Sequence, residues 1–433
     1  MTSPSIQRIN EYNRFGSKLG LERMEKLLEL LDHPERDLCV IHVAGTNGKG
    51  SVCRYIYEVL LANGYGVGLY ISPFLEVFNE RMEVDGERIT DLQLEKHTSR
   101  VLRAAESLQA QGEESPTEFE IVTAIAFSFF QEQKCDFVVL EVGLGGSGDS
   151  TNVIKNPLLT IITSISYDHM DRLGGTLEEI AGEKAGIIKE RVPCVIYVED
   201  LAAARVIAKR AYEKNAPLYD ATGLEHHHWV PTLEGQVFDT KIHGTYYSNV
   251  RIRMLGMHQV HNAITALTAL EVLRQSKKIQ VTKDLLYQGM ERASQPGRFE
   301  IMKREPYVIL DGAHNQAGAE SLAETMGEFF QGASVLMVVG ILADKEVDAM
   351  IGPFCEVGCE FIVTEPISPR ALPAEELGEK LKKKGKPVEV YTDMKEATRR
   401  GMQRLEEENW DVLVFGGSLY LVGKVREMMG NGR

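Results

Sequence analysis

Short apolar runs alternate with amphipathic stretches through most of this 433-residue chain, and this alternation constrains the fold more than any other feature. An apolar run of about four to eight residues between turn residues is typical of a buried strand, whereas apolar residues three or four positions apart are typical of a helix. Strands that alternate with helices predict βαβ units, and therefore an α/β fold with a mostly parallel sheet. In the first part of the chain the predicted strands are residues 38–44, 66–72, 136–142 and 158–165, and the predicted helices are residues 52–60 and 118–132.

The rhythm breaks twice, and these breaks indicate the domain organisation. Residues 229–254 carry shorter alternating runs, which predict an antiparallel excursion, and a helix is predicted over residues 258–275. Residues 294–300 (SQPGRFE) place Pro and Gly between periodic regions, as an interdomain hinge does. Because the strand–helix rhythm restarts after this hinge, we expect two domains, residues 1–295 and residues 296–433.

Composition excludes several classes of protein. The chain has 48 Lys and Arg residues against 63 Asp and Glu residues, a formal net charge of −15, so nucleic acid and anionic membranes are not expected as partners. No apolar run is long enough to predict a membrane span, and residues 1–10 lack the basic-then-apolar pattern of a secretory signal. Six scattered cysteines favour neither a zinc site nor a disulfide framework, which indicates a cytoplasmic location. The histidines at 226–228 point to alternating faces of an extended segment, so we interpret them as surface side chains.

A glycine-rich turn, GTNGKGS at residues 45–51, lies between the first predicted strand and the first predicted helix. Glycines let backbone N–H groups point inward at a phosphate, the helix N-terminus favours negative charge, and Lys49 is placed for the outer phosphates. The match to the general P-loop pattern is imperfect, because Val43 stands where the first glycine belongs and Gly50 separates Lys49 from Ser51. A tight strand-to-helix turn is the alternative. The pattern favours nucleotide binding by Asn47, Gly48, Lys49, Gly50 and Ser51.

With this turn and a series of later motifs, the chain resembles folylpolyglutamate synthase, which in many bacteria is bifunctional with dihydrofolate synthase and belongs to the Mur ligase superfamily. The resemblance covers most of the chain and implies a P-loop sheet domain followed by a smaller Rossmann-like α/β domain. The further motifs, in chain order, are residues 72–82 (SPFLEVFNERM), 117–120 (TEFE), 140–146 (LEVGLGG), 168–176 (DHMDRLGGT), 183–187 (EKAGI), 296–300 (PGRFE) and 311–315 (DGAHN).

Three metal-ligand candidates follow predicted strands. Ser72, Glu141 and His169 lie at or beyond the carboxyl ends of their strands, where ligands gather in open α/β sheets. Position alone leaves a solvent-facing acid and a metal ligand equally open for Glu141. The resemblance implies that all three bind Mg²⁺, which keeps waters and phosphate oxygens in its remaining positions.

Lys184 has two interpretations. The residues alone favour a solvated lysine on a helix that also carries Glu178, Glu179 and Glu183. In the related enzymes the lysine of this EKAGI segment is carbamylated, which converts a cation that repels Mg²⁺ into an anion that can accept it. The resemblance therefore implies a catalytic, carbamylated Lys184 alongside Lys49 and His169.

The remaining site candidates lie in both predicted domains. Asn262, Arg298 and Asp311 match family positions that contact ATP, although a helix-cap amide, a loop arginine and a strand-end acid are the plainer interpretations. His314 and Ser418 follow strands in similar turns and are further ligand candidates, and His258 and His261 are interpreted as helix-start packing. The chain departs from the family at Ser147, where the related enzymes have an arginine, so a bidentate donor is lost. The positions that match the family's folate-binding side are Thr117, Glu118, Phe119, Glu120, Asp149 and Ser150.

The implied activity is ATP-dependent amide ligation through an acyl phosphate. The γ-phosphoryl group of ATP would activate a carboxylate of folate or of dihydropteroate, and the amino group of L-glutamate would then attack it; positioning and charge neutralisation suffice for such a transfer. Two alternatives stay open: a Mur-type ligase for another carboxylate, although those usually carry GTNGKT, and a non-catalytic P-loop nucleotide-binding protein. A monomer is expected, because one chain supplies both halves of the site.

Overall fold

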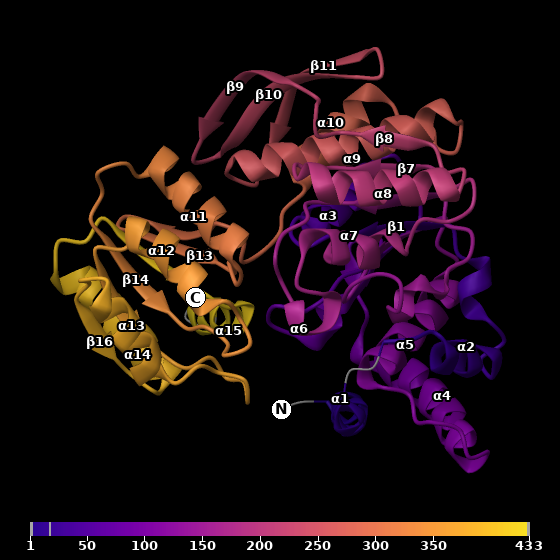
Figure 1. Ribbon diagram of the computed structural model, residues 1–433, viewed down its shortest axis with the longest axis horizontal. Coiled ribbons are helices and arrows are strands. Elements are labelled where there is room, and N and C mark those ends of the chain that lie inside the picture. The colour runs from indigo at the N-terminus through magenta and orange to yellow at the C-terminus, as the bar shows by residue number, and fades with distance from the viewer. Residues whose placement is uncertain (1–2, 17–18, 431–433) are drawn as a thin grey trace.

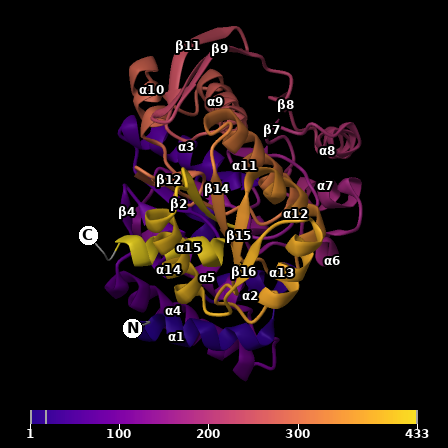
Figure 2. The ribbon, with the colours of Figure 1, turned by 90° about the vertical axis from the view of Figure 1, so that its left-hand side faces the viewer.

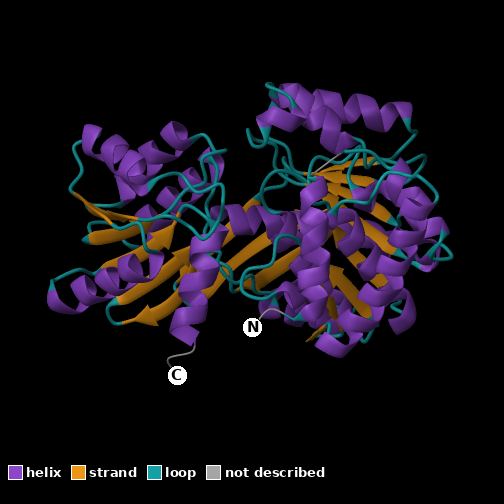
Figure 3. Ribbon diagram, turned by 90° about the horizontal axis from the view of Figure 1, so that it is seen from below, coloured by secondary structure: helices purple, strands orange, loops and turns teal. Residues whose placement is uncertain are grey.

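Two α/β units, each a sheet covered by helices, make up most of the computed structural model, which describes residues 3–16 and 19–430 (Figure 1). The N-terminal unit precedes the predicted hinge, and the C-terminal unit follows it. Seen from below, the strands of both sheets run between layers of helices (Figure 3). The α/β prediction is therefore confirmed. The boundary at residues 295/296 stays a prediction, and the outermost residues of both predicted domains lie outside the described chain.

The large sheet of the N-terminal unit is parallel except at one edge, where β3 and β4 turn back. Its strand β1 is entirely buried, and its side chains alternate between two cores: Ile41 and Val43 contact one, Val40 the other. The predicted strands of this unit are present. The strands, in spatial order, are β4 (Glu87–Arg88), β3 (Met82–Val84), β2 (Val67–Tyr70), β5 (Phe137–Glu141), β1 (Val40–Ala44), β6 (Leu159–Ile162), β7 (Cys194–Ile196) and β8 (Leu218–Asp220).

Helices cover both faces of this sheet. One core packs α3, α9 and α10 against it, a second packs α1, α2, α4 and α5 on the opposite face, and a third lies under α7 and α8. Between them run short 3₁₀ turns, η1 (Glu11–Phe15), η2 (Pro34–Asp37), η3 (Phe78–Arg81) and η4 (Ser150–Val153). The helices of this unit are α1 (Pro4–Asn10), α2 (Glu22–Glu29), α3 (Lys49–Ala62), α4 (Asp91–Ala110), α5 (Glu118–Gln133), α6 (Met170–Leu173), α7 (Leu177–Ala185), α8 (Leu201–Glu213), α9 (Met257–Gln275) and α10 (Lys283–Arg292).

The predicted antiparallel excursion is a separate three-stranded sheet of β9 (His226–Thr232), β10 (Gly235–Ile242) and β11 (Thr245–Ile252), which packs beside α9 and α10 (Figure 1). It begins at His226, three residues earlier than predicted. The exposed His228 ring lies 2.8 Å from a carboxylate oxygen of Asp239 on β10, so it makes a surface contact within the hairpin.

The sheet of the C-terminal unit is parallel except for β12, an antiparallel edge strand that the sequence analysis did not predict. Its other strands alternate with helices along the chain, as predicted for the residues after the hinge. Figure 2 shows this unit in front of the N-terminal unit. The strands, in spatial order, are β12 (Glu300–Arg304), β13 (Tyr307–Asp311), β17 (Val412–Gly416), β14 (Val335–Val339), β15 (Glu360–Val363) and β16 (Val388–Val390). The helices are α11 (Gln316–Phe329), α12 (Val347–Val357), α13 (Ala374–Lys383), α14 (Met394–Glu407) and α15 (Leu419–Gly430).

Two further observations bear on the sequence analysis. None of the described helices is both long and apolar enough to cross a membrane. The cysteines of the described chain all carry free thiols.

Candidate active site

The glycine-rich turn wraps around the N-terminus of α3, and a side chain added at either of two of its glycines would collide with a neighbouring side chain. Gly45 (φ +146°) lies so close to β6 that an added Cβ would sit 1.8 Å from Oγ1 of Thr163. Gly48 (φ +84°) would place a Cβ 2.3 Å from Oδ1 of Asn262. Both glycines therefore combine a backbone conformation that other residues rarely adopt with an approach too close for a Cβ unless the neighbouring side chain moves.

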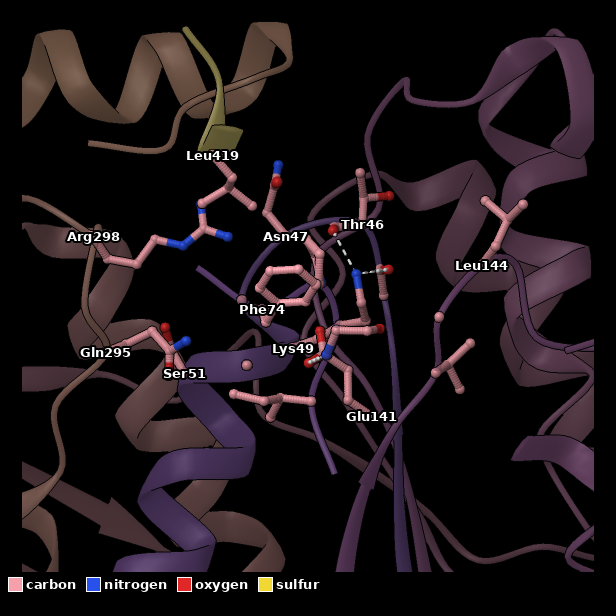
Figure 4. Close-up of a pocket in the computed structure, with 18 of the residues that line it drawn as sticks. Thr46, Asn47, Lys49, Ser51, Phe74, Glu141, Leu144, Gln295, Arg298 and Leu419 are labelled. Atoms are coloured by element: carbon pink, nitrogen blue, oxygen red, sulfur yellow. Dashed lines mark hydrogen bonds between the residues drawn. The ribbon is translucent and has the colours of Figure 1, made fainter. Parts of the chain in front are cut away.

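Lys49 is the first residue of α3, and its ammonium group folds back over the turn. Nζ donates to the carbonyl oxygens of Gly45 (3.2 Å) and Thr46 (3.0 Å), as Figure 4 shows with dashed lines. The helix N-terminus adds partial positive charge at the same place. We call the pocket that this turn lines the loop pocket; its walls include residues 45–51.

The three metal-ligand candidates all line the loop pocket. Glu141 ends β5, and Oε2 of its buried carboxylate accepts a hydrogen bond from the backbone N–H of Ser72 (3.0 Å). Burial raises the pKa of Glu141, and the nearby Lys49 ammonium opposes that shift. Burial also lowers the pKa of His169, which favours the neutral imidazole that a metal needs.

These donors suit a hard cation that keeps part of its own hydration. Within residues 3–16 and 19–430 no three His, Cys, Asp or Glu side chains gather as a metal-binding cluster. One carboxylate, one hydroxyl and one imidazole beside the glycine-rich turn nevertheless fit Mg²⁺, which is usually held by one or two protein groups together with waters and phosphate oxygens.

Lys184 is buried instead of solvated, so the interpretation that the residues alone favoured is wrong. It projects from α7, its side chain is enclosed, and Nζ donates to the carbonyl oxygen of Gly45 at 2.9 Å. Burial, together with the neighbouring Lys49 charge, lowers its pKa to about 7. The neighbouring glutamates of α7 gave no sign that Lys184 is buried, because residues that enclose it, such as Gly45, are distant in sequence.

Residues of the hinge and of the C-terminal unit contribute a second wall. In Figure 4, Arg298, Gln295 and Leu419 approach the loop pocket from the side opposite Lys49 and Glu141. Gln295 was not predicted. Its Oε1 is buried and has no hydrogen-bond partner among the residues that the structure describes, and its amide nitrogen lies 3.6 Å from where a Cβ on Gly50 would be. Its place three residues before Arg298 in the hinge was the available signal.

Asn262 and Asp311 are close to the loop pocket but not among its lining residues. Asn262 lies under Gly48, as described above. The carboxylate of Asp311 accepts hydrogen bonds from the backbone N–H groups of Phe299 and Ala313, both at 2.8 Å. Burial raises its pKa. Asp311 thus fixes the two segments that carry Arg298 and His314.

Side chains from the two units meet directly across the site. Lys345 places its ammonium 2.5 Å from Oδ1 of Asp168, and Asn315 donates to Oδ2 of the same carboxylate at 3.1 Å. Burial alone would raise the pKa of Asp168, but Lys345, His169 and His314 hold it well below its usual range. The side-chain amides of Asn47 and Asn315 exchange hydrogen bonds at 3.2 and 3.1 Å. No role was predicted for Asp168, Lys345 or Asn315 from the sequence.

The last helix closes one end of this region. A Cβ on Gly423 of α15 would lie 1.9 Å from the carbonyl oxygen of Leu75, so the helix touches the backbone of the loop that follows Ser72. Arg426 of α15 also contacts the carboxylate of Glu76 in that loop.

A second pocket adjoins the loop pocket and shares Ser72, His169, His314 and Leu419 with it. We call it the cleft pocket. Phe119 packs so tightly against Gly143 that an added Cβ would lie 2.3 Å from the ring. Both units line the pocket, with Leu19, Arg81, Thr117, Phe119, Leu144, Asp149 and Ser150 from one and Leu342, Lys345, Arg370, Ser418 and Tyr420 from the other.

The TEFE segment is divided between this pocket and the cap of a helix. Thr117 and Phe119 line the cleft pocket, whereas Glu118 and Glu120 do not. Thr117 and Glu120 form a capping box at the start of α5, with the Thr117 N–H donating to Glu120 at 2.7 Å, and Arg23 pairs with Glu120 at 3.0 Å. The T-x-x-E spacing was itself the signal for this cap.

Asp149 and Ser147 also have local partners. The carboxylate of Asp149 accepts hydrogen bonds from the N–H of Leu144 (2.9 Å) and from the N–H and hydroxyl of Thr151 (3.0 and 2.5 Å), so it fixes the loop behind the cleft pocket. The Ser147 hydroxyl donates to the carbonyl oxygen of Glu183 at 3.1 Å. Position 147 therefore faces α7 and not the cleft pocket.

Comparisons with known proteins agree with this arrangement. Residues 43–270 match the Mur ligase middle domain, and residues 297–419 match the Mur ligase, glutamate ligase domain. The dihydrofolate synthase/folylpolyglutamate synthase of Bacillus subtilis is 38% identical over 420 residues, 96% of each chain. The folylpolyglutamate synthase of Mycobacterium tuberculosis, solved with ADP and AMPPCP, has a TM-score of 0.91 at 31% identity over 98% of each chain. The Escherichia coli protein FolC, solved with DHPP and ADP, has a TM-score of 0.86 at 30% identity and covers 100% of this chain and 99% of that one.

Proposed function

Because this chain belongs to the folylpolyglutamate synthase/dihydrofolate synthase family of Mur ligases, and is thus an ATP-dependent ligase that adds L-glutamate to folate, we propose that the loop pocket is its ATP site and the cleft pocket its acceptor site. The observation that carries this assignment is that the two pockets meet at Ser72 and His169. A phosphoryl group bound on one side and a carboxylate bound on the other would come together there.

In this proposal the glycine-rich turn binds the triphosphate. Asn47, Gly48, Gly50 and Ser51 would present backbone and side-chain donors, and Lys49 would exchange its two carbonyl partners for phosphate oxygens. Arg298 would approach from the opposite wall, while Asn262 and Asp311 would act by fixing Gly48 and the Arg298 segment. Transfer of the phosphoryl group needs little beyond such positioning and charge neutralisation.

Ser72, Glu141 and His169 would hold Mg²⁺, whose positive charge would offset that of the phosphates. The buried Glu141 carboxylate, already oriented by the Ser72 N–H, supports this assignment. His169 is the third proposed ligand, and it also borders the cleft pocket.

Lys184 would be carbamylated. Its neutral amine would attack CO₂, forming a nitrogen–carbon bond and releasing a proton, so that a buried cation becomes an anion beside the metal ligands. The support is that burial lowers its pKa to about 7, which leaves much of the amine neutral and reactive at physiological pH.

The acceptor carboxylate would lie at the junction of the two pockets. One of its oxygens would take the γ-phosphoryl group as ADP departs; the α-amino group of L-glutamate would then attack the acyl carbon, forming the amide as phosphate leaves. Thr117, Phe119, Asp149 and Ser150 would shape the folate end, and His314 would border the reacting end. We include dihydropteroate as a second acceptor, because the Bacillus subtilis relative is named for both activities.

The assembly and location of the enzyme complete the proposal. One chain supplies both walls of the site, so we propose that it acts as a monomer, which light scattering on the purified protein tests. Free thiols on all described cysteines favour a reducing compartment such as the cytoplasm.

Release of ADP tests the function. The protein is incubated with ATP alone, and then with L-glutamate plus folate, dihydropteroate or a muramyl peptide. We expect ADP release that depends on both glutamate and a folate-type acceptor, with a product one glutamate longer. If ADP were released with L-glutamate and the muramyl peptide but with neither of the other acceptors, the protein would be a ligase for another carboxylate. If none of the acceptors increased ADP release, it would be a nucleotide-binding protein without ligase activity.

A further inference from the structure

The cleft pocket has three arginine or lysine side chains in its lining, and two of them are already paired. Lys345 lies 2.5 Å from Asp168, and Arg370 lies 2.8 Å from Asp344. Arg81 makes no salt bridge with any residue of the described chain. Burial raises the pKa of the Glu118 carboxyl and the Arg81 charge opposes that shift, but the two side chains form no salt bridge in the described chain. Among the arginine and lysine side chains that line this pocket, Arg81 is thus the one left to pair with an anion from outside the protein.

Arg81 is nevertheless held in a defined place. Its guanidinium carbon lies 5.4 Å from the centre of the Phe74 ring and 5.5 Å from that of Phe78, within the range of cation–π attraction. Its Nε is buried and has no hydrogen-bond partner among the described residues. A buried donor without a partner costs free energy, so a ligand that supplied an acceptor would recover it.

The backbone of Arg81 lies beside the segment that leads into Ser72, at the reacting end of the pocket. It ends η3, and its carbonyl oxygen accepts a hydrogen bond from the N–H of Ile71 at 3.1 Å. Ile71 immediately precedes Ser72, where the cleft pocket meets the loop pocket. The guanidinium therefore projects from a backbone that is fixed beside that junction.

We propose that Arg81 binds the α-carboxylate of the terminal glutamate of a folate acceptor, and so selects acceptors that already carry a glutamate. The inference rests on the proposed function. A folate ends in two carboxylates joined through three carbon atoms: the γ-carboxylate reacts, and the α-carboxylate stays anionic close by. A planar guanidinium with several parallel N–H donors matches a carboxylate in a bidentate fashion.

This assignment makes Arg81 a specificity-determining residue. Each glutamate added through the γ-carboxylate presents a new terminal α-carboxylate, so Arg81 would serve every round of addition. Dihydropteroate ends in a single benzoate carboxylate, which is the reacting group, and leaves Arg81 without a partner. Arg81 therefore separates glutamate addition to folates from glutamate addition to dihydropteroate.

The test compares kcat/KM for folate, for the folate α-amide, which keeps the γ-carboxylate but loses the α-charge, and for dihydropteroate. We expect the wild-type enzyme to prefer folate over its α-amide by about 10- to 100-fold, as for one charged hydrogen-bonded pair. Arg81→Gln should lower kcat/KM for folate by a similar factor, abolish the preference and leave dihydropteroate within about twofold. Arg81→Lys, which keeps the charge, should restore part of the preference.

Arg14→Gln is the matched control, because it removes an arginine stacked on Phe15 that lines neither pocket. Equal losses on all three acceptors in Arg81→Gln would overturn the proposal, since they would indicate a contact with the shared ring system or a structural role. If Arg370→Gln lost the preference for folate and Arg81→Gln kept it, the α-carboxylate would be bound by the C-terminal unit and not by Arg81. If the wild-type enzyme used folate and its α-amide equally well, the proposal would be overturned even if no variant folded. If the wild-type enzyme used none of the acceptors, the result would count against the proposed function itself.

Discussion

The ammonium group of Lys345 lies 2.5 Å from Oδ1 of Asp168, and this ion pair joins the C-terminal unit to the loop that carries His169. Both side chains are nearly enclosed, with 7% and 8% of their surfaces exposed. Lys345 and Asp168 lie on opposite sides of the predicted hinge, so the pair forms only when the two units close on each other. Loss of this ion pair should therefore disturb how the two units are placed around the site.

Asp168→Asn should be strongly destabilising, because it leaves the Lys345 charge enclosed without its counter-ion. Loss of one partner of a buried pair costs about 3–5 kcal/mol. Urea unfolding measures the loss, and Asp168→Asn/Lys345→Met should recover much of it. Asp348→Asn is the control, since it breaks a pair with Lys380 in which Asp348 is 81% exposed and should cost less than about 1 kcal/mol. Equal small losses in both variants would show that the closed arrangement does not depend on this pair.

Lys49→Ala should lower kcat by about 10²- to 10³-fold, the usual effect of removing one group that stabilises developing charge. The fold should survive, because the two bonds that Lys49 makes are to carbonyl groups of its own loop. Steady-state kinetics and a thermal melt separate the two effects. Near-normal turnover by a well-folded Lys49→Ala protein would count heavily against ATP activation at this loop.

Carbamylation should be visible by ¹³C NMR after equilibration with ¹³C-labelled bicarbonate. Only the neutral amine reacts, and the pKa of Lys184 is about 7, so the carbamate signal should grow as the pH rises from 6 to 8. The signal should vanish in Lys184→Met. Lys189→Met is the control, because burial also lowers the pKa of Lys189, to about 8, yet this lysine lines neither pocket. A signal that persisted in Lys184→Met would place the modification elsewhere.

In buffer free of CO₂, Lys184 should make the stability of the protein depend on pH. The ordinary pKa of a lysine is 10.5, whereas that of Lys184 in the fold is about 7, so between these two pH values the unfolded chain binds one more proton than the folded chain. The free energy of unfolding should therefore rise with pH from about 7 upward, and this contribution should be flat below 7, where both states are protonated. Unfolding curves of the wild type and of Lys184→Met at pH 6, 7, 8 and 9 give the difference; parallel curves would mean that the amine is not desolvated.

Gly48→Ala should weaken ATP binding and destabilise the fold by more than backbone strain alone. Alanine at φ +84° costs about 1–2 kcal/mol, and its Cβ would also collide with Asn262. Gly64→Ala is a close control, because its φ is +83° and nothing lies within 4 Å of the added Cβ. Urea unfolding and the KM for ATP should show a larger effect for Gly48→Ala than for Gly64→Ala. Adding Asn262→Ala to Gly48→Ala should remove the part of the loss that comes from the collision and leave the backbone strain. If both substitutions lowered the free energy of unfolding equally, the Asn262 side chain would be able to move away from the added Cβ with little loss of stability.

Sequence patterns predicted those parts of the fold that depend on neighbouring residues. The apolar run of β1 and the glycine-rich turn that follows it are local signals, and both elements lie where they were expected. The edge strand β12 was missed because its EIMKR sequence has no continuous apolar run, and its pairing with β13 is what makes it a strand.

The candidate site was predictable where a motif and a strand end coincide, as at Glu141. It was not predictable where partners come from different elements. The burial of Lys184 depends on the approach of α7 to Gly45, and the pairing of Asp168 with Lys345 depends on how the two units close. Glu120 shows the converse: its spacing from Thr117 is a local signal for the helix cap that the structure contains.

The contact between Gly423 and Leu75 has a consequence for how the protein is made. During translation, the loop that carries Ser72 leaves the ribosome about 350 residues ahead of α15, which later covers it. Until residues 419–430 have emerged and docked, that wall of the cleft is missing. A nascent chain can therefore form the glycine-rich turn long before α15 covers the loop that follows Ser72, and the wall that α15 supplies is complete only after residues 419–430 have docked.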